Sequence, residues 1–213
     1  MSGTAPFRPE EGYVKYTADH KTAGAVEPPL WKELNEARTR LYDLGLIGAL
    51  PNGVGFGNVS VRVRDDEFLI SGTATGARRV LSPNEYCMVN SVNIEENRVT
   101  TSGPVRASAE SMSHGAVYYA CASVMCVIHI HNRKIFDAMI SGGRVSTPPE
   151  AAYGTPELAL AIASLAAKTG AGGGASRGVM VLAGHDEGVL SYGGSVKEAL
   201  DLILDLYAQY TGL

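Results

Sequence analysis

The sequence predicts a single α/β domain built on a mixed or antiparallel sheet with helices packed on it. Strand pairs joined by short turns dominate the first half of the chain, and helices alternate with single short strands in the second half. No internal repeat and no shift in composition divides the chain. These observations favour this architecture over a doubly wound parallel fold, in which strands and helices alternate throughout.

The first half of the domain follows an N-terminal arm, residues 1–28, which is mixed polar with Pro and Gly. We expect one domain over 29–213. Apolar side chains at helical spacing predict its first helix, and alternating apolar and polar residues predict the strands after it. Ser82 and Glu85 form a capping-box pattern around Pro83. The expected order is a helix over 29–50, strands over 58–64 and 67–71, a helical turn at 82–85, and strands over 86–94 and 98–101.

The second half is richer in helices. Thr155 before Pro156, and Ser195 three residues before Glu198, mark the beginnings of two of them. Short runs rich in β-branched residues indicate the strands. The expected helices cover 108–121, 133–141, 155–168 and 195–210, and the expected strands cover 124–131, 179–183 and 188–192.

The composition is that of a globular protein, with 45% hydrophobic and 19% charged residues in a chain of 213. The 18 basic and 22 acidic side chains give a net charge of −4, so we expect no nucleic-acid partner. No apolar run is long enough to span a membrane. The N-terminus has no hydrophobic signal core, and Cys87, Cys121 and Cys126 form no CxxC pair. We therefore expect reduced thiols and a cytoplasmic location.

Two glycine-rich segments do not match nucleotide-binding motifs. Gly53, Gly55 and Gly57 are followed by Asn58 where a dinucleotide fingerprint needs its last glycine, and the segment follows a helix and precedes a strand, the reverse of the required order. The 169–178 segment lacks the Gly-Lys-Ser/Thr of a phosphate loop, and we expect a flexible surface loop there. For residues 55–58 two interpretations remain open, a tight turn into a strand or backbone N–H groups that face an anion.

Two of the five histidines, His129 and His131, stand two residues apart in a predicted strand. Side chains at this spacing point to the same face, which they share with Val127. The other face carries only Cys126 and two isoleucines. A pair of adjacent imidazoles is one way in which a sheet offers nitrogen ligands to a metal ion. Two hydrogen-bonded core histidines would give the same spacing, so spacing alone leaves both interpretations open.

Further ligands would have to come from elsewhere in the chain. His185, in a turn between two short strands, is a candidate third ligand, and Glu110, near the start of a predicted helix, is a candidate fourth. His114 lies one turn after Glu110 on the same helix face. It is a rival ligand, although we favour a histidine that is hydrogen-bonded in the core or orients Glu110.

Several ordered motifs then support one resemblance, from about Trp31 to Tyr207, to the class II aldolase/adducin family. No single motif is specific, but their order and spacing together are. They are Gly57-Asn58-Val59-Ser60-Val61-Arg62, Leu69-Ile70-Ser71, Ser108-Ala109-Glu110 with His114, Val127-Ile128-His129-Ile130-His131, Tyr153-Gly154-Thr155-Pro156-Glu157-Leu158, and His185 before Gly188-Val189-Leu190.

The resemblance implies an α/β fold in α/β/α layers, with a largely antiparallel central sheet, in a homotetramer. It implies a divalent metal, most commonly Zn²⁺, with Mn²⁺, Co²⁺, Fe²⁺ and Ni²⁺ as alternatives. The metal would be held by His129, His131 and His185, with Glu110 as the acid/base carboxylate. It also implies that substrate phosphate is bound by Gly57, Asn58, Ser71, Gly72, Thr75, Gly76 and Ser108. The helix start at 108–111 agrees with an anion site, since a helix dipole and free N–H groups attract anions.

The function implied is a metal-dependent aldolase that cleaves or forms a C–C bond in a small phosphorylated ketose through a metal-bound ene-diolate. Related epimerases, decarboxylases and dehydratases on the same scaffold are alternatives. A further alternative is a non-catalytic, adducin-like interaction domain, against which the presence of Glu110 and the three histidines argues.

The chain departs from the family pattern at several positions. Ala109 replaces a serine of the phosphate pocket, and Asp186-Glu187 follow His185 where a glycine is usual. The stretch that carries a catalytic tyrosine in the family's aldolases is missing between His131 and Tyr153, so that residue is not assigned. Arg78 and Arg79 are expected to be exposed surface charges rather than phosphate ligands.

Overall fold

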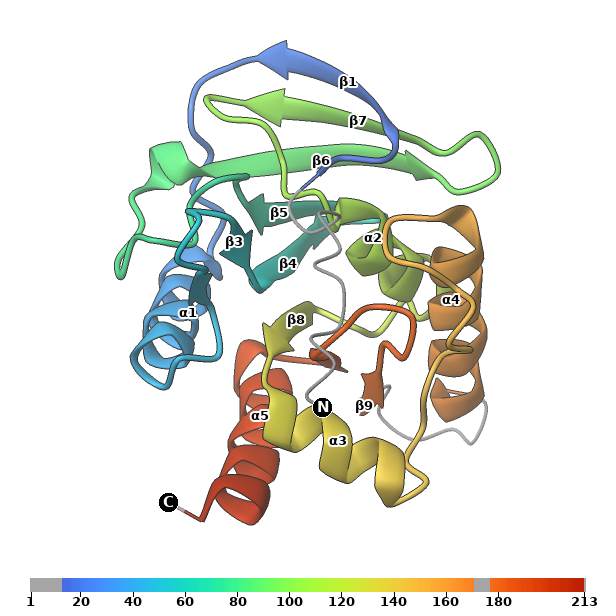
Figure 1. Ribbon diagram of the computed structural model, residues 1–213. Helices are drawn as coiled ribbons and strands as arrows, with labels where there is room; N and C mark the ends of the chain where they lie inside the picture. The colour runs from blue at the N-terminus through green and yellow to red at the C-terminus, as the bar shows by residue number, and fades with distance from the viewer. Residues whose placement is uncertain (1–12, 171–176, 213) are drawn as a thin grey trace.

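The computed structural model describes residues 13–170 and 177–212. Eight strands form one sheet in the order β1-β7-β6-β5-β4-β8-β10-β9, and β2 pairs with β3 beside it (Figure 1). Neighbours in the large sheet are antiparallel except β1 and β7. The strands are β1 Thr17–Thr22, β2 Gly48–Ala49, β3 Gly55–Phe56, β4 Asn58–Arg64, β5 Glu67–Ser71, β6 Tyr86–Asn93, β7 Arg98–Gly103, β8 Cys126–His131, β9 Gly178–Val181 and β10 Gly188–Gly193. The helices are α1 Trp31–Asp43, α2 Ser111–Ala120, α3 Arg133–Ser141, α4 Pro156–Gly170 and α5 Val196–Thr211.

Helices cover both faces of the sheet, which gives the expected three layers (Figure 1). On one side α2 and α4 pack together over one hydrophobic core. On the other side α1, α3 and α5 enclose a second core. Strand β8 shows how the sequence divides between the two, because Val127 belongs to the first core and Cys126, Ile128 and Ile130 belong to the second. The predicted α/β fold with a largely antiparallel sheet is therefore confirmed.

Several predicted caps have the expected bonds. The Ser195 hydroxyl accepts a hydrogen bond from the Glu198 amide at 3.1 Å at the start of α5. Ser82 and Glu85 form the capping box of a short 3-10 turn over Pro83–Glu85. These local bonds satisfy backbone groups that would otherwise lack partners, so they fix where the elements begin.

The predicted helix over 29–50 is wrong at its C-terminal end. Helix α1 stops at Asp43, and Gly45 turns the chain with a φ of 70°. Leu46 and Ile47 are nevertheless fully buried in the same core as the helix. Their apolar character continued the helical pattern, although they belong to the connection that leads into β2.

Part of the expected N-terminal arm joins the sheet. Strand β1 pairs in parallel with β7 at the edge of the sheet, from Thr17 beside Arg98 to Thr22 beside Gly103. Residues 1–12 of the arm lie outside the described residues, as do residues 171–176 of the expected glycine-rich loop. Within the described ranges, no helix has both the length and the hydropathy that crossing a membrane would require.

Candidate metal centre and the cavity beside it

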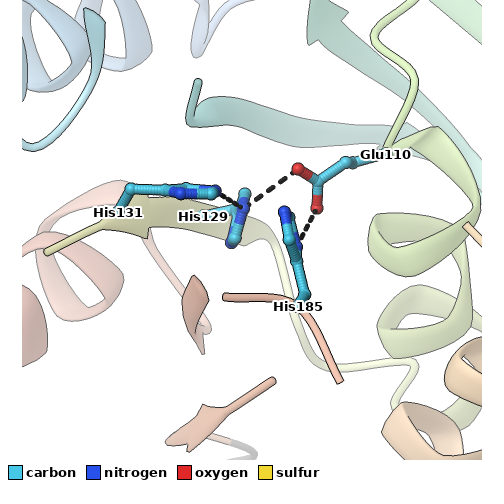
Figure 2. Close-up of side chains that lie close together, drawn as sticks. All are labelled: Glu110, His129, His131 and His185. Atoms are coloured by element: carbon cyan, nitrogen blue, oxygen red, sulfur yellow. Dashed lines mark hydrogen bonds and ion pairs between the residues drawn. The ribbon is translucent and has the colours of Figure 1, made fainter. Parts of the chain in front are cut away.

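Glu110, His129, His131 and His185 converge at one point of the fold (Figure 2). The histidine pair lies at the end of β8, His185 lies in the turn between β9 and β10, and Glu110 immediately precedes α2. One ligand atom from each residue lies within 4.8 Å of the others. The structure thus brings together all four residues that the sequence analysis selected as candidate metal ligands and acid/base group.

The contacts within this group are close. Glu110 Oε1 lies 3.0 Å from His129 Nε2, and His129 Nε2 lies 3.0 Å from His131 Nε2. Glu110 Oε2 lies 3.7 Å from His185 Nδ1 (Figure 2). The side chains therefore point their nitrogen and oxygen atoms at each other, an arrangement that a shared cation would stabilise.

The tautomer of the neutral His129 ring follows from the contact made by its second nitrogen. His129 Nδ1 lies 3.1 Å from the carbonyl oxygen of Val189, which can only accept a hydrogen bond. Nδ1 therefore carries the proton in the neutral ring, and Nε2 presents a lone pair toward Glu110. A ring nitrogen held in this way by a backbone carbonyl is typical of histidines that bind metals.

Burial and charge suit the same interpretation. The side chains of His129 and Glu110 are 0% and 7% exposed. Burial raises the pKa of Glu110, but the facing His129 and His185 outweigh it and hold that pKa well below its usual range. Burial lowers the pKa of His131 well below that of an ordinary histidine. The ionised Glu110 carboxylate and the neutral His131 imidazole are the forms in which these groups bind a metal ion.

One oxygen of this group has no hydrogen bond. Glu110 Oε2 is buried and finds no hydrogen-bond partner among the described residues. An unsatisfied buried carboxylate oxygen is costly unless a cation is close by. The donor set of three imidazoles and one carboxylate fits a divalent metal such as zinc. The buried group could therefore bind a metal ion.

The turn before α2 is held by Ser108. Its hydroxyl accepts a hydrogen bond from the Glu110 amide at 3.3 Å, and its carbonyl accepts one from the Ser111 amide at 3.1 Å. The expectation that the helix start offers free N–H groups to an anion is therefore wrong for Glu110 and Ser111. The bonds instead fix the backbone from which the Glu110 side chain reaches the histidines.

His114 lies outside the four-residue group. Its Nδ1 lies 2.7 Å from the hydroxyl of Ser60, which in turn lies 2.8 Å from the Tyr118 hydroxyl. Burial lowers the pKa of His114 to about 3. His114 is thus a neutral, hydrogen-bonded core histidine one turn after Glu110, as favoured above.

The turn that carries His185 is tied to the start of α3. Arg133 contacts Asp186 at 2.5 Å and Glu187 at 3.3 Å. The Asn132 amide also donates a hydrogen bond to the Glu187 carbonyl. The two acidic residues that replace the family's glycine therefore form exposed ion pairs with α3.

A cavity of about 190 Å³ opens beside Glu110. Most of the residues expected to bind phosphate line it: Gly57, Asn58, Gly72, Thr75, Gly76 and Ser108. Ser71, which was also expected to bind phosphate, does not line the cavity. It is buried in the sheet, where its hydroxyl accepts a hydrogen bond from the Val59 amide. The buried Asn58 Oδ1 has no hydrogen-bond partner in the described chain. The cavity therefore offers polar atoms and closely approached backbone to a small ligand.

Two glycines are sterically required in this wall. A Cβ on Gly76 would lie 2.1 Å from the Gly48 carbonyl oxygen. Gly57 has a φ of 71°, and a Cβ there would lie 2.8 Å from Ile47 and 3.1 Å from the His129 carbonyl. Gly57 thus makes the tight turn into a strand that was one interpretation of residues 55–58, whereas the interpretation that N–H groups face an anion stays a prediction.

Arginines stabilise the loop around the cavity from outside. Arg78 pairs with Glu85, and Arg79 pairs with Asp43, each at 2.6 Å on the surface. The buried Arg38 donates hydrogen bonds to the carbonyls of Thr75, Arg78 and Arg79. Arg78 and Arg79 are exposed ion-pair residues, as expected.

Sequence reasoning missed two tyrosines at the cavity. Tyr13 and Tyr153 both line it, and the Tyr153 ring centroid lies 4.5 Å from that of His185. Tyr153 stood in a recognised motif, but nothing in the motif placed its ring on a histidine. Tyr13 stood in the expected arm, where no periodic pattern indicated a contact.

Comparison with known proteins agrees with this geometry. The family model of the class II aldolase and adducin N-terminal domain matches residues 33–208. A comparison with curated protein sequences gives no match.

Solved structures with this fold include several aldolases. An L-fuculose-1-phosphate aldolase from Thermus thermophilus is 23% identical, with a TM-score of 0.58 over 83% of this chain and 88% of its own. A second L-fuculose 1-phosphate aldolase is 20% identical, with a TM-score of 0.60 over 85% and 83%. YgbL from Klebsiella pneumoniae, a candidate aldolase, epimerase or decarboxylase, is 20% identical, with a TM-score of 0.56 over 82% and 83%. At these identities the likeness establishes the shared fold.

Proposed function

The chain belongs to the class II aldolase and adducin family, and on that premise we propose that it is a metal-dependent aldolase that cleaves or forms a C–C bond in a small phosphorylated ketose. The observation that carries this proposal is the convergence of Glu110 with three histidines beside a small polar cavity. Names of solved neighbours support the same reaction class, since two of them are fuculose-1-phosphate aldolases.

His129, His131 and His185 are proposed to hold the metal, and zinc suits three imidazoles with a further position left open. When bound, a divalent metal supplies a Lewis acid that stabilises negative charge on substrate oxygens. The β8 backbone fixes two of these imidazoles side by side. The Val189 carbonyl selects the tautomer of the neutral His129 ring that leaves Nε2 free to bind a metal.

Glu110 is proposed as the acid/base group. Its carboxylate is ionised, its Oε2 has no hydrogen bond in the described chain, and it lines the cavity. It can therefore accept a proton from the carbon next to a ketone and return it later, as a general base and then a general acid. Ser108 holds the backbone of Glu110 and keeps this carboxylate in place.

The other end of the cavity is proposed to bind phosphate. The backbone of Gly57, Gly72 and Gly76 allows close approach, and Asn58, Thr75 and Ser108 supply polar side chains. Ala109 also lines the cavity and brings no hydroxyl. The ligand class that these groups fit is a small sugar phosphate, and the protomer is proposed to act in a homotetramer.

The test uses zinc-loaded protein and dihydroxyacetone phosphate in deuterated water. Loss of one C3 proton signal in the NMR spectrum at a single stereochemical position supports the aldolase half-reaction. Exchange that occurs only with other ketone or keto-acid phosphates would reassign the chain to epimerase, decarboxylase or dehydratase chemistry. No exchange with any of them, in protein that also fails to bind zinc, would favour an adducin-like interaction domain.

A further inference from the structure

The segment that precedes the family domain reaches the candidate site. The family model begins at residue 33, whereas residues 13–22 lie before it and include β1. Two hydrogen bonds fix the backbone at the start of β1. The Thr17 amide donates to the Asn97 carbonyl at 2.8 Å, and the Asn97 side-chain amide donates to the Lys15 carbonyl at 3.0 Å.

Tyr16 joins this segment to the backbone before α2. Its hydroxyl donates a hydrogen bond of 2.9 Å to the carbonyl of Ser108, which lines the cavity two residues before Glu110. The ring is 7% exposed, and burial raises the pKa of Tyr16 to about 12. Because this phenol remains protonated, it is a permanent donor to the Ser108 carbonyl.

Lys15 joins the segment to the other side of the cavity. Its Nζ lies 5.3 Å from the centroid of the Tyr153 ring, and its side chain packs against Gly154. The Tyr153 hydroxyl lies 3.4 Å from the Tyr13 carbonyl, and its ring packs on His185. Tyr13 is therefore held between a fixed strand start and the aromatic ring that contacts a candidate metal ligand.

Tyr13 itself lines the cavity together with Glu110, Asn58 and Tyr153. Its side chain is 65% exposed, so it borders the opening rather than the floor. A phenol at this place can both donate and accept a hydrogen bond and can cover a ligand with its ring. The volume of the cavity, about 190 Å³, is smaller than that of pockets for drug-sized ligands. A molecule that fills it therefore also reaches Tyr13.

We propose that Tyr13 is a substrate-contacting residue in the wall of the active site, contributed from outside the family domain and held in place by the contacts of Lys15 and Tyr16. The ligand would be a small hydroxylated phosphate, an assignment that rests on the proposed function. The phenol hydroxyl contributes a hydrogen bond, and the ring limits the size of the molecule that enters beside Tyr153.

The experiment compares Tyr13→Phe and Tyr13→Ala with Tyr119→Ala. Tyr119 is a suitable control because it is 76% exposed and lines a different cavity. Calorimetric titration of each zinc-loaded protein with dihydroxyacetone phosphate gives Kd, and the deuterium exchange assay runs in parallel. We expect Kd to rise about threefold in Tyr13→Phe and about tenfold in Tyr13→Ala, with no change in Tyr119→Ala. Zinc content and melting temperature should be unchanged in all three.

The outcomes separate this inference from the proposed function. Exchange in wild-type protein with the same Kd in both Tyr13 variants would overturn the inference and leave the aldolase proposal standing. A raised Kd in the Tyr13 variants without exchange in wild-type protein would support the inference and overturn the aldolase proposal. If neither dihydroxyacetone phosphate nor inorganic phosphate binds to wild-type protein, both are overturned.

Discussion

Glu110 Oε1 lies 3.0 Å from Nε2 of His129, although the two residues come from a helix start and a central strand. The opposite nitrogen of His129 donates its proton to the Val189 carbonyl. Both atoms of the 3.0 Å contact are therefore acceptors in the neutral ring, and they repel each other unless a positive charge lies close by. This relationship is the structural reason for proposing a metal ion at this point.

Substitution of the carboxylate should stop proton transfer without unfolding the protein. Glu110→Gln keeps the size of the side chain but cannot accept a proton, so the rate of deuterium exchange should fall by about 10²- to 10⁴-fold. Glu157→Gln, at an exposed position at the start of α4, is the matched control and should exchange at the wild-type rate. Equal rates in the Glu110 variant and wild-type protein would remove Glu110 from the mechanism.

Stability should fall in acid partly because of His114. Its pKa is about 3 in the folded protein because of burial, against about 6.5 in an unfolded chain. The unfolded state therefore takes up a proton that the folded state does not, and the stabilisation present above about pH 6.5 is lost as the pH falls toward about 3. Between about pH 6.5 and 5 the free energy of unfolding should drop by about 2 kcal/mol from this group.

Denaturant unfolding of metal-free protein at several pH values measures this effect. His114→Asn should be less stable at neutral pH because it loses the contact with Ser60, but its stability should depend less steeply on pH. An identical pH dependence in variant and wild-type protein would show that His114 is not the group that titrates.

The glycine wall of the cavity should not tolerate a methyl group. Gly76→Ala places a Cβ 2.1 Å from the Gly48 carbonyl oxygen and should cost about 1–3 kcal/mol of stability. Gly24→Ala is the control, since no atom lies within 4 Å of its added Cβ. Melting temperatures measured by circular dichroism should drop by several degrees in the first variant only. A wild-type melting temperature for Gly76→Ala would mean that the close approach of these loops is not needed.

Arg38 and Arg79, which contact each other in the fold, should differ strongly in their contribution to stability. Arg38→Met leaves the carbonyls of Thr75, Arg78 and Arg79 without their buried donor and should cost about 2–4 kcal/mol. Arg79→Met removes only an exposed, solvent-screened ion pair with Asp43 and should cost far less than Arg38→Met. Urea unfolding of both variants provides the comparison, and equal losses would contradict the role given to Arg38.

The histidine pair was predictable from sequence because strand geometry is local. Alternation alone put His129 and His131 on one face of β8, and the structure places them with Val127 on the side of α2. The contacts of this pair with Glu110 and His185 depend on the packing of elements far apart in the chain. Residue type made Glu110 and His185 candidates, but periodicity could not place them beside the pair, and only the resemblance to a family implied those contacts.

The missed features share a different cause. Strand β1 is mostly exposed on both faces, so it has no apolar alternation by which a strand is recognised. Leu46 and Ile47 extended a helical pattern because they are buried in the same core as α1. Tyr13 reaches the cavity only because β1 pairs with β7, which is a tertiary contact.

The most direct measurement is the zinc content of the protein after purification without a metal-affinity tag and reloading from the metal-free state. We expect one tightly bound zinc ion per chain, and loss of that ion in His129→Ala. His20→Ala should keep it, because His20 contacts Thr101 at the edge of the sheet and lies outside the four-residue group. Wild-type protein that binds no zinc or other divalent metal would contradict the metal site on which the proposed function depends.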